Sequence, residues 1–146
     1  MVRKLASTIA LATLVVVPGI IAGCGQSGTG GTVESIVRAE LGEYYLKLDK
    51  TTVPAGKVTF AVTNAGKMDH ELIIFKTDLA ADKLPTEKDD PTRVDEEKIG
   101  AIGEVEDIAP NRTKSGTFEL TAGKYVLICN KPGHYAAGQK IAFEVS

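Results

Sequence analysis

Metal-binding and redox-active side chains are scarce in this sequence, which has two cysteines, two histidines and two methionines among 146 residues. The histidines are His70 and His134, and the cysteines are Cys24 and Cys129. An excess of positive charge is also missing, because 17 basic side chains face 19 acidic ones. Contact with phosphates needs a basic face, so this charge balance argues against nucleic acid as a partner. No internal repeat is present.

The first 23 residues have the pattern of a secretion signal. Arg3 and Lys4 precede a short apolar run and then small residues, and this run is too short and too poorly flanked for a membrane-spanning helix. The sequence IAGC at 21–24 resembles the lipobox of bacterial lipoproteins, in which the cysteine is acylated. A cleaved signal with an incidental cysteine is the alternative. We expect a signal peptide at 1–23 and lipidated Cys24 on the outer face of the cell membrane, periplasmic or at the cell surface.

Residues 24–32 follow as a lipidated cysteine and a flexible linker rich in glycine, serine and threonine. Without the first 23 residues the chain carries 15 basic and 19 acidic side chains, a net charge of −4. Residues 33–146 are enough for one domain with one core.

The domain has the pattern of an all-β protein. Short runs rich in β-branched and aromatic residues are separated by turn signals that contain glycine, proline and asparagine. Such runs favour an antiparallel β-sandwich. The predicted strands are 44–50, 57–64, 70–76, 115–121, 124–130 and 139–146.

One segment breaks this pattern. Residues 78–107 contain eleven acidic and four basic side chains, and Pro85 and Pro91 interrupt any helix. We expect a long acidic loop with a short helix. Its two interpretations are a solvated excursion and a docking surface for a basic partner.

Cys129 is the only thiol that remains once Cys24 is lipidated, so a disulfide within the chain is excluded. His134 follows Cys129 by five positions, and Gln139 follows His134 by five. The Pro-Gly pair at 132–133 can fold the chain back, which lets the three side chains converge.

His70 begins another predicted strand, and a sandwich can bring that strand's edge beside the same loop. Two imidazoles, one thiolate and a weaker oxygen donor form the His₂Cys arrangement of electron-transfer copper. Zinc in a tetrahedral site is the alternative. Taken singly, each candidate has an ordinary explanation, as a core or loop histidine or as a small buried apolar cysteine.

The segments NAGKMDHELIIF at 64–75 and GKYVLICNKPGHYAAGQ at 123–139 resemble the cupredoxins, the type 1 blue copper proteins. Within them, the chain is most similar to plastocyanin- and sulfocyanin-like lipoproteins. The resemblance implies a Greek-key β-sandwich and one copper ion per chain that alternates between Cu(I) and Cu(II). It also implies equatorial ligands at His70, Cys129 and His134, with Asn64, Glu71 and Tyr125 around them.

The chain departs from the common family pattern at two positions. Most relatives have methionine at the axial position, whereas Gln139 resembles the stellacyanins and implies a lower reduction potential. The alternatives are a solvent-facing Gln139 with three-coordinate copper, or Met68 as a ligand, although core filler is the preferred interpretation of Met68. The residue after the first histidine is often asparagine, and here it is Glu71, whose backbone amide is still available to the thiolate. Tyr125 matches the tyrosine of the Greek-key corner, with a plain core residue as the alternative.

These features predict a monomeric electron carrier that exchanges electrons with redox partner proteins through the edge of His134. A small apolar docking patch is expected around it, because such a face gives weak, fast-exchanging contacts. The patch comprises Pro132, Tyr135, Ala136 and Ala137. The alternative is a protein for copper storage, delivery or tolerance, but only one methionine remains after the signal. An enzyme is not expected, because no histidines remain for an open or second metal site.

Overall fold

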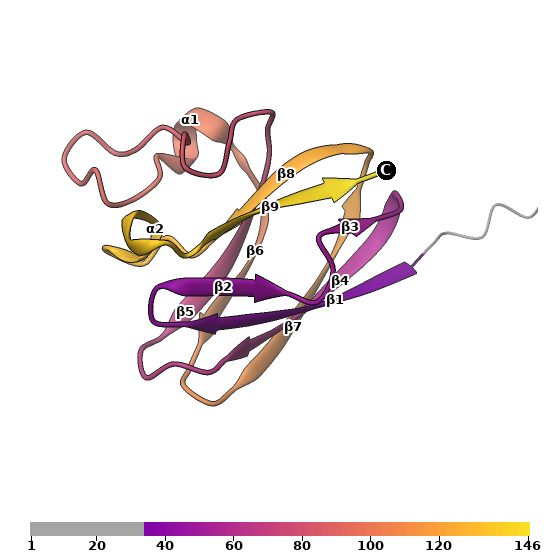
Figure 1. Ribbon diagram of the computed structural model, residues 1–146, viewed down its shortest axis with the longest axis horizontal. Helices are drawn as coiled ribbons and strands as arrows, with labels where there is room; N and C mark the ends of the chain where they lie inside the picture. Colours follow the sequence, from indigo (N-terminus) through magenta and orange to yellow (C-terminus); the bar gives the residue numbers. More distant parts are fainter. Residues whose placement is uncertain (1–33) are drawn as a thin grey trace, which may run out of the picture. The chain divides into compact units, whose positions relative to one another are not determined.

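The computed structural model describes residues 34–146, which form a β-sandwich with two one-turn helices (Figure 1). The strands are β1 (Glu34–Gly42), β2 (Tyr45–Leu48), β3 (Thr52–Val53), β4 (Gly56–Asn64), β5 (His70–Lys76), β6 (Ala101–Ile108), β7 (Thr113–Leu120), β8 (Gly123–Ile128) and β9 (Lys140–Val145). The helices are α1 (Glu96–Ile99) and α2 (His134–Ala137). The signal predicted at 1–23, lipidated Cys24, the linker at 24–32 and residue 33 lie outside the described residues. Within 34–146, no helix has the length and apolar character needed to cross a membrane.

The strands form two sheets, ordered β2-β1-β4-β7 and β3-β9-β8-β5-β6. The predicted β-sandwich is confirmed, but the purely antiparallel arrangement is wrong, because β1 pairs with β4 and β3 pairs with β9 in parallel. The chain reverses direction between β1 and β2 and again before β4, so β4 runs in the direction of β1.

All six predicted strands are present, with ends within two residues of the predicted ones. Strands β1, β3 and β6 were not predicted. β6 begins inside the expected acidic loop 78–107, so that prediction is wrong for residues 101–107. In β6, Val105 and Ile108 are buried, while its acidic side chains are exposed at the sheet edge. Edge strands commonly carry such charges because they discourage pairing with other chains, and here they masked the strand pattern.

Apolar side chains form two cores. The main core lies between the sheets and includes Phe60, Leu72 and Phe143. A second core lies on the outer face of the five-stranded sheet, where Ile73 of β5 and Ile128 of β8 pack. Because β5 and β8 are covered on both faces, their apolar residues run continuously instead of alternating.

The second core is covered by the β5–β6 connection, residues 77–100. Leu84 and Val94 of this connection are 5% and 0% exposed and pack in the second core. An antiparallel bridge between Thr86 and Val94 folds the connection onto itself. The expected short helix is α1, whose first turn is capped by Asp95. The interpretation as a solvated excursion is therefore wrong, because apolar anchors fix this acidic segment to the sheet.

Tyr125 closes the turn between β7 and β8. Its hydroxyl donates to the carbonyl of Thr121 at 2.6 Å, and its ring is 2% exposed in the main core. This bond to backbone a few residues upstream is the geometry of a tyrosine corner. The expected role of Tyr125 in the Greek-key corner is confirmed. Its expected place around the ligands is wrong, because Tyr125 lies opposite Lys76, at the other end of β5 from His70.

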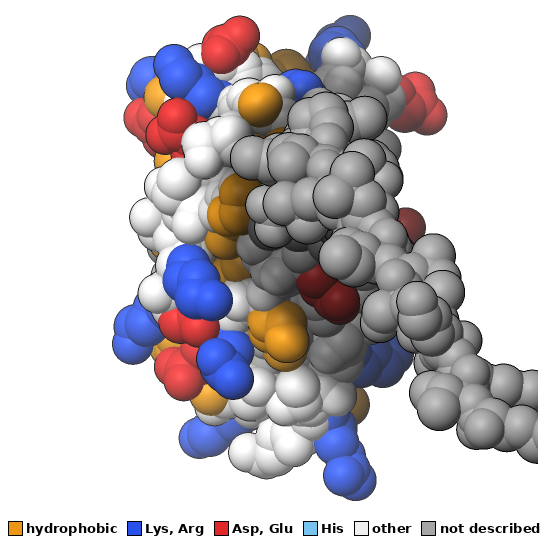
Figure 2. Space-filling model, turned by 90° about the vertical axis from the view of Figure 1, so that its right-hand side faces the viewer, with side chains coloured by type: hydrophobic (Ala, Val, Ile, Leu, Met, Phe, Trp, Pro, Cys, Tyr) orange, Lys and Arg blue, Asp and Glu red, His pale blue; other side chains and the backbone are white. Residues whose placement is uncertain are grey.

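Figure 2 views the sandwich from the side opposite α2. Among the described side chains visible there, lysine and arginine are interspersed with aspartate and glutamate. These charges therefore give that face no strong field of one sign.

Candidate metal centre

His70, Cys129 and His134 come together in the folded chain. The Cys129 sulfur lies 3.3 Å from Nδ1 of His134 and 3.8 Å from Nδ1 of His70. A set of potential ligand atoms from the three residues lies within 4.8 Å of one another. The predicted convergence is confirmed, and it brings together both histidines and the only cysteine of the described residues.

Strand pairing accounts for the position of His70. β5 and β8 are antiparallel neighbours, with Ile73 opposite Ile128. Since His70 begins β5, it lies beside the residues that follow β8, of which Cys129 is the first. A contact across 59 positions of sequence thus follows from the register of one strand pair.

Backbone hydrogen bonds close the ligand loop, residues 129–139. The amide of Cys129 donates to the carbonyl of Gln139 at 3.0 Å, and the amide of Gln139 donates to the carbonyl of His134 at 3.1 Å. Gly133 has a φ of 82°, in the left-handed region that glycine adopts without strain. It precedes the single turn of α2, in which His134 is the first residue.

Burial keeps this group uncharged near neutral pH. His70 and Cys129 are fully buried, and His134 is 4% exposed. Burial lowers the pKa of His134, and burial together with the neighbouring His134 lowers the pKa of His70. Burial raises the pKa of the Cys129 thiol, which backbone N–H groups of Lys131 and Glu71 partly offset. The amide of Glu71 thus acts on the thiol, as expected.

Gln139 is buried next to the histidines, and its amide orientation is set by backbone carbonyls. Its Nε2 donates to the carbonyl of Gly42 at 2.6 Å and contacts that of Tyr45 at 3.4 Å. The same nitrogen is 3.3 Å from Nδ1 of His70. Only an NH₂ group can donate to carbonyl oxygens, so Oε1 is left as the acceptor end of the amide.

Two buried side-chain polar atoms in the described residues lack a hydrogen-bond partner, and both belong to this site. They are Nε2 of His70 and Oε1 of Gln139. Buried polar atoms are normally paired, so an unpaired one requires an explanation. A fourth, weak oxygen ligand at Oε1 of Gln139 fits the donor set of two imidazoles and one thiolate. The residues present therefore fit a copper ion.

Met68 does not have the expected role of core filler. It is 42% exposed, and its backbone N–H donates to the Glu43 carboxylate at 3.0 Å. Gln139, not Met68, is the residue that lies against the buried imidazole of His70.

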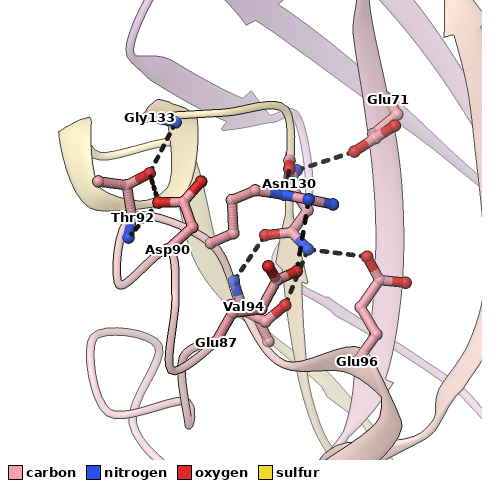
Figure 3. Close-up of polar contacts among 9 residues, drawn as sticks. Glu71, Glu87, Asp90, Thr92, Val94, Glu96, Asn130 and Gly133 are labelled. Atoms are coloured by element: carbon pink, nitrogen blue, oxygen red, sulfur yellow. Dashed lines mark hydrogen bonds and ion pairs between the residues drawn. The ribbon is translucent and has the colours of Figure 1, made fainter.

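Glu71 supports the ligand loop with its side chain as well as its backbone. Its Oε1 accepts from the backbone N–H of Asn130 at 3.1 Å (Figure 3). Its Oε2 pairs with Nζ of Lys131 at 2.9 Å. The carboxylate thus ties β5 to the two residues that follow Cys129, a contribution that the sequence left open.

Asn64 fixes the segment that leads into His70. Its Nδ2 donates to the carbonyls of Met68 and Ile108, both at 2.7 Å, and its Oδ1 accepts from the amide of Gly66 at 2.8 Å. Because Asn64 is fully buried, these bonds have little competition from water. The expected place of Asn64 beside the ligands is supported by this geometry.

The predicted docking patch needs one correction. Tyr135 is 5% exposed, because its ring packs in the second core and its hydroxyl donates to the carbonyl of Ala81 at 2.9 Å. It therefore cannot form part of a surface. The other three predicted residues are exposed: Pro132, Ala136 and Ala137.

Tyr44 was not predicted as part of the site. It is 55% exposed, and its ring meets that of His134 edge-on, with the centroids 6.0 Å apart. The sequence placed Tyr44 at the start of a strand, whereas it lies in the turn between β1 and β2 with a φ of 71°. The only indication of this role in the sequence was an aromatic residue at the end of a predicted strand.

No family model and no curated protein sequence matches this chain. Solved structures do match it. Reduced auracyanin from the photosynthetic bacterium Roseiflexus castenholzii is 25% identical, with a TM-score of 0.57 over 80% of this chain and 99% of that one. Auracyanin B is 22% identical, with a TM-score of 0.55 over 80% and 91% of the two chains. Rusticyanin from Thiobacillus ferrooxidans is 18% identical, with a TM-score of 0.57 over 77% of each.

Auracyanin and rusticyanin are cupredoxins, and the described domain has their β-sandwich fold. Its His-Cys-His group is arranged as in blue copper sites. The fold and the grouping that the sequence resemblance implied are therefore both present.

Copper binding should release about one proton per chain near pH 7, because a coordinating thiol must lose its proton. The raised pKa of Cys129 means that the thiol is protonated at pH 7, and the lowered histidine pKa values mean that both imidazoles are already neutral. Calorimetric titration in buffers of different ionisation enthalpy measures the release. Release of no proton, or of further protons from the imidazoles, would contradict these protonation states.

Proposed function

We propose that this chain, a cupredoxin in fold, binds one copper ion and carries single electrons at the outer face of a cell membrane. The observation that carries the proposal is the burial of one thiol and two imidazoles around a common point. That donor set, with a weak fourth ligand, is typical of electron-transfer copper sites. Bound copper would supply the one-electron change between Cu(I) and Cu(II).

His70, Cys129 and His134 would hold the metal, and Oε1 of Gln139 would be the axial donor. The donor set favours copper over zinc, because copper binds more tightly in the Irving–Williams order and a single thiolate is unusual for structural zinc. The three donors are held by β5, the end of β8 and α2. Donors fixed in this way undergo little rearrangement when the charge of the metal changes.

Electrons would enter and leave at the edge of His134. The ring is 4% exposed, and Tyr44 lies against it. We define the His134 patch as the exposed residues Tyr44, Pro132, Ala136 and Ala137. A small apolar face of this kind suits weak and transient contacts with redox partner proteins.

The lipobox-like sequence at 21–24 supports attachment through acylated Cys24. The linker after it would give the domain a root-mean-square reach of roughly 15 Å from the membrane surface. A tethered monomer of this kind could exchange partners by rotation and short displacement alone.

The alternative function, copper storage, delivery or tolerance, is less well supported. Handing copper to another protein requires donors that the recipient can reach, and Cys129 and His70 are fully buried. A catalytic role is also disfavoured, because catalytic metals keep an open coordination position and four protein donors would leave none here.

Addition of Cu(II) to the protein should produce an intense visible sulfur-to-copper charge-transfer band and a narrow copper hyperfine splitting in the electron paramagnetic resonance spectrum. Both follow from a covalent bond between copper and the Cys129 thiolate. The variant Cys129→Ser should bind copper without this band. A colourless complex of the unmodified protein, or colour that survives in Cys129→Ser, would reject the proposal.

Replacement of the axial donor should raise the reduction potential. An amide oxygen is a harder ligand than a thioether and stabilises Cu(II), so Gln139→Met should shift the potential upward in a spectroscopic redox titration. If the potential of Gln139→Met equals that of the unmodified protein, Gln139 does not bind the metal.

Removal of the exposed ring beside His134 should slow electron exchange without changing the copper site. For Tyr44→Ala we expect self-exchange to fall roughly tenfold, which corresponds to about 1.4 kcal/mol of encounter stability. Line broadening in mixtures of oxidised and reduced protein measures this rate. Ile36→Ala is the matched control, because Ile36 is 48% exposed in the half of β1 away from the site. Equal rates in Tyr44→Ala and Ile36→Ala would remove Tyr44 from the docking surface.

A further inference from the structure

Asn130 follows Cys129 directly and is fully buried, and each of its polar groups is hydrogen-bonded. Its backbone N–H donates to Glu71, as described above. Its backbone carbonyl accepts from Nε of Arg93 at 3.0 Å. The main chain on the far side of the cysteine is therefore held from two directions, by β5 and by the β5–β6 connection.

The Asn130 side chain binds the connection as a neighbouring strand would. Its Oδ1 accepts from the backbone N–H of Val94 at 2.7 Å, and its Nδ2 donates to the carbonyl of Val94 at 3.0 Å (Figure 3). Nδ2 also donates to the Glu96 carboxylate at 2.7 Å. A primary amide has one acceptor oxygen and two donor hydrogens, and here both ends are used. An aspartate or an aliphatic residue could not make this set of bonds.

Two further residues connect the same segments. Oγ1 of Thr92 accepts from the amide of Gly133 at 3.1 Å, and the Thr92 carbonyl accepts from the amide of Ala136 at 3.3 Å. The hydroxyl of Tyr135 accepts from the amide of Leu84 at 3.2 Å. The β5–β6 connection thus binds the ligand loop at its beginning, in its turn and along α2.

The direction of the Cys129 side chain depends on this attachment. In extended backbone, adjacent side chains point to opposite sides. Cys129 packs in the main core, while Asn130 faces the connection outside the sheet. A buried polar network with every member bonded restricts motion more than isolated bonds do. Fixing the Asn130 amide therefore also fixes the direction in which the neighbouring sulfur points.

We propose that Asn130 is a positioning residue, through which the β5–β6 connection holds the ligand loop in its metal-binding geometry before any metal is present. This proposal rests on the proposed function for its role in copper binding, whereas the metal-free geometry can be tested separately. The connection, which the sequence marks only by its acidity, is in this account the outer support of the metal centre.

The test compares full-length protein variants that lose different contacts of the connection with the loop. Asn130→Ala removes the amide, Thr92→Val removes the acceptor for Gly133, and Tyr135→Phe removes one hydroxyl. Thr59→Val is the matched control for Thr92→Val, because Thr59 makes a comparable hydroxyl contact, at 2.7 Å to Thr117, on the opposite sheet.

Amide hydrogen exchange of the metal-free proteins gives the first readout. Exchange at residues 131–138 should accelerate in Asn130→Ala and, to a smaller extent, in Thr92→Val and Tyr135→Phe, while β4 and β7 keep their protection. Thr59→Val should leave the loop unchanged. Equal acceleration in β4 and β7 would show a merely structural role and overturn the proposal. If Asn130→Ala does not fold, unchanged loop exchange in both Thr92→Val and Tyr135→Phe would overturn it.

Copper affinity and the electron paramagnetic resonance spectrum give the second readout. Loss of a residue that orients metal ligands typically weakens binding by roughly 10- to 100-fold, and we expect a loss in this range for Asn130→Ala with an altered copper hyperfine splitting. Unchanged affinity and spectrum would overturn the proposed role in copper binding. If the unmodified protein gives no type 1 spectrum, the proposed function fails, and the exchange experiment still decides whether Asn130 positions the loop.

Discussion

The contact of the Cys129 sulfur with the Nδ1 atoms of His70 and His134 is the constraint on which the site depends. Burial of polar groups costs free energy unless they find partners, and these groups lie in the interior with few partners other than one another. Burial also keeps the group neutral without a metal, since it disfavours the thiolate and both imidazolium ions. A metal ion that binds here would therefore replace the proton of the Cys129 thiol, whereas the two imidazoles are already neutral and would release none.

The rest of the fold explains how such a group is held. The pairing of β5 with β8 places His70, and the hydrogen-bonded ligand loop places His134. Asn64 steadies the chain before β5, while Glu71 and Asn130 steady the chain after Cys129. The β5–β6 connection combines a charged surface, as in an exposed loop, with buried apolar side chains, as in a core segment. Its acidic side chains keep its surface polar, while Leu84 and Val94 anchor it in the second core.

Much of this arrangement could be predicted from the sequence, because it follows from local pattern. Alternation and turn residues indicated six strands, and the spacing of Cys129, His134 and Gln139 indicated one loop. β6 was missed because a sequence rich in exposed carboxylates on an edge strand has the same composition as a solvent-exposed loop. The burial of Tyr135 and the role of Asn130 depend on contacts with residues of a connection that lie 34 or more positions away, for which no local pattern exists. The parallel pairing of β1 with β4 was missed for the same reason.

X-ray absorption spectroscopy of the copper-loaded protein tests the central claim most directly, because it identifies the atoms bound to the metal. The account predicts one sulfur and two imidazole nitrogens in the nearest shell, with the sulfur contribution lost in Cys129→Ser. A nearest shell without sulfur, or with one imidazole only, would show that the three buried side chains do not bind copper together and would contradict the account.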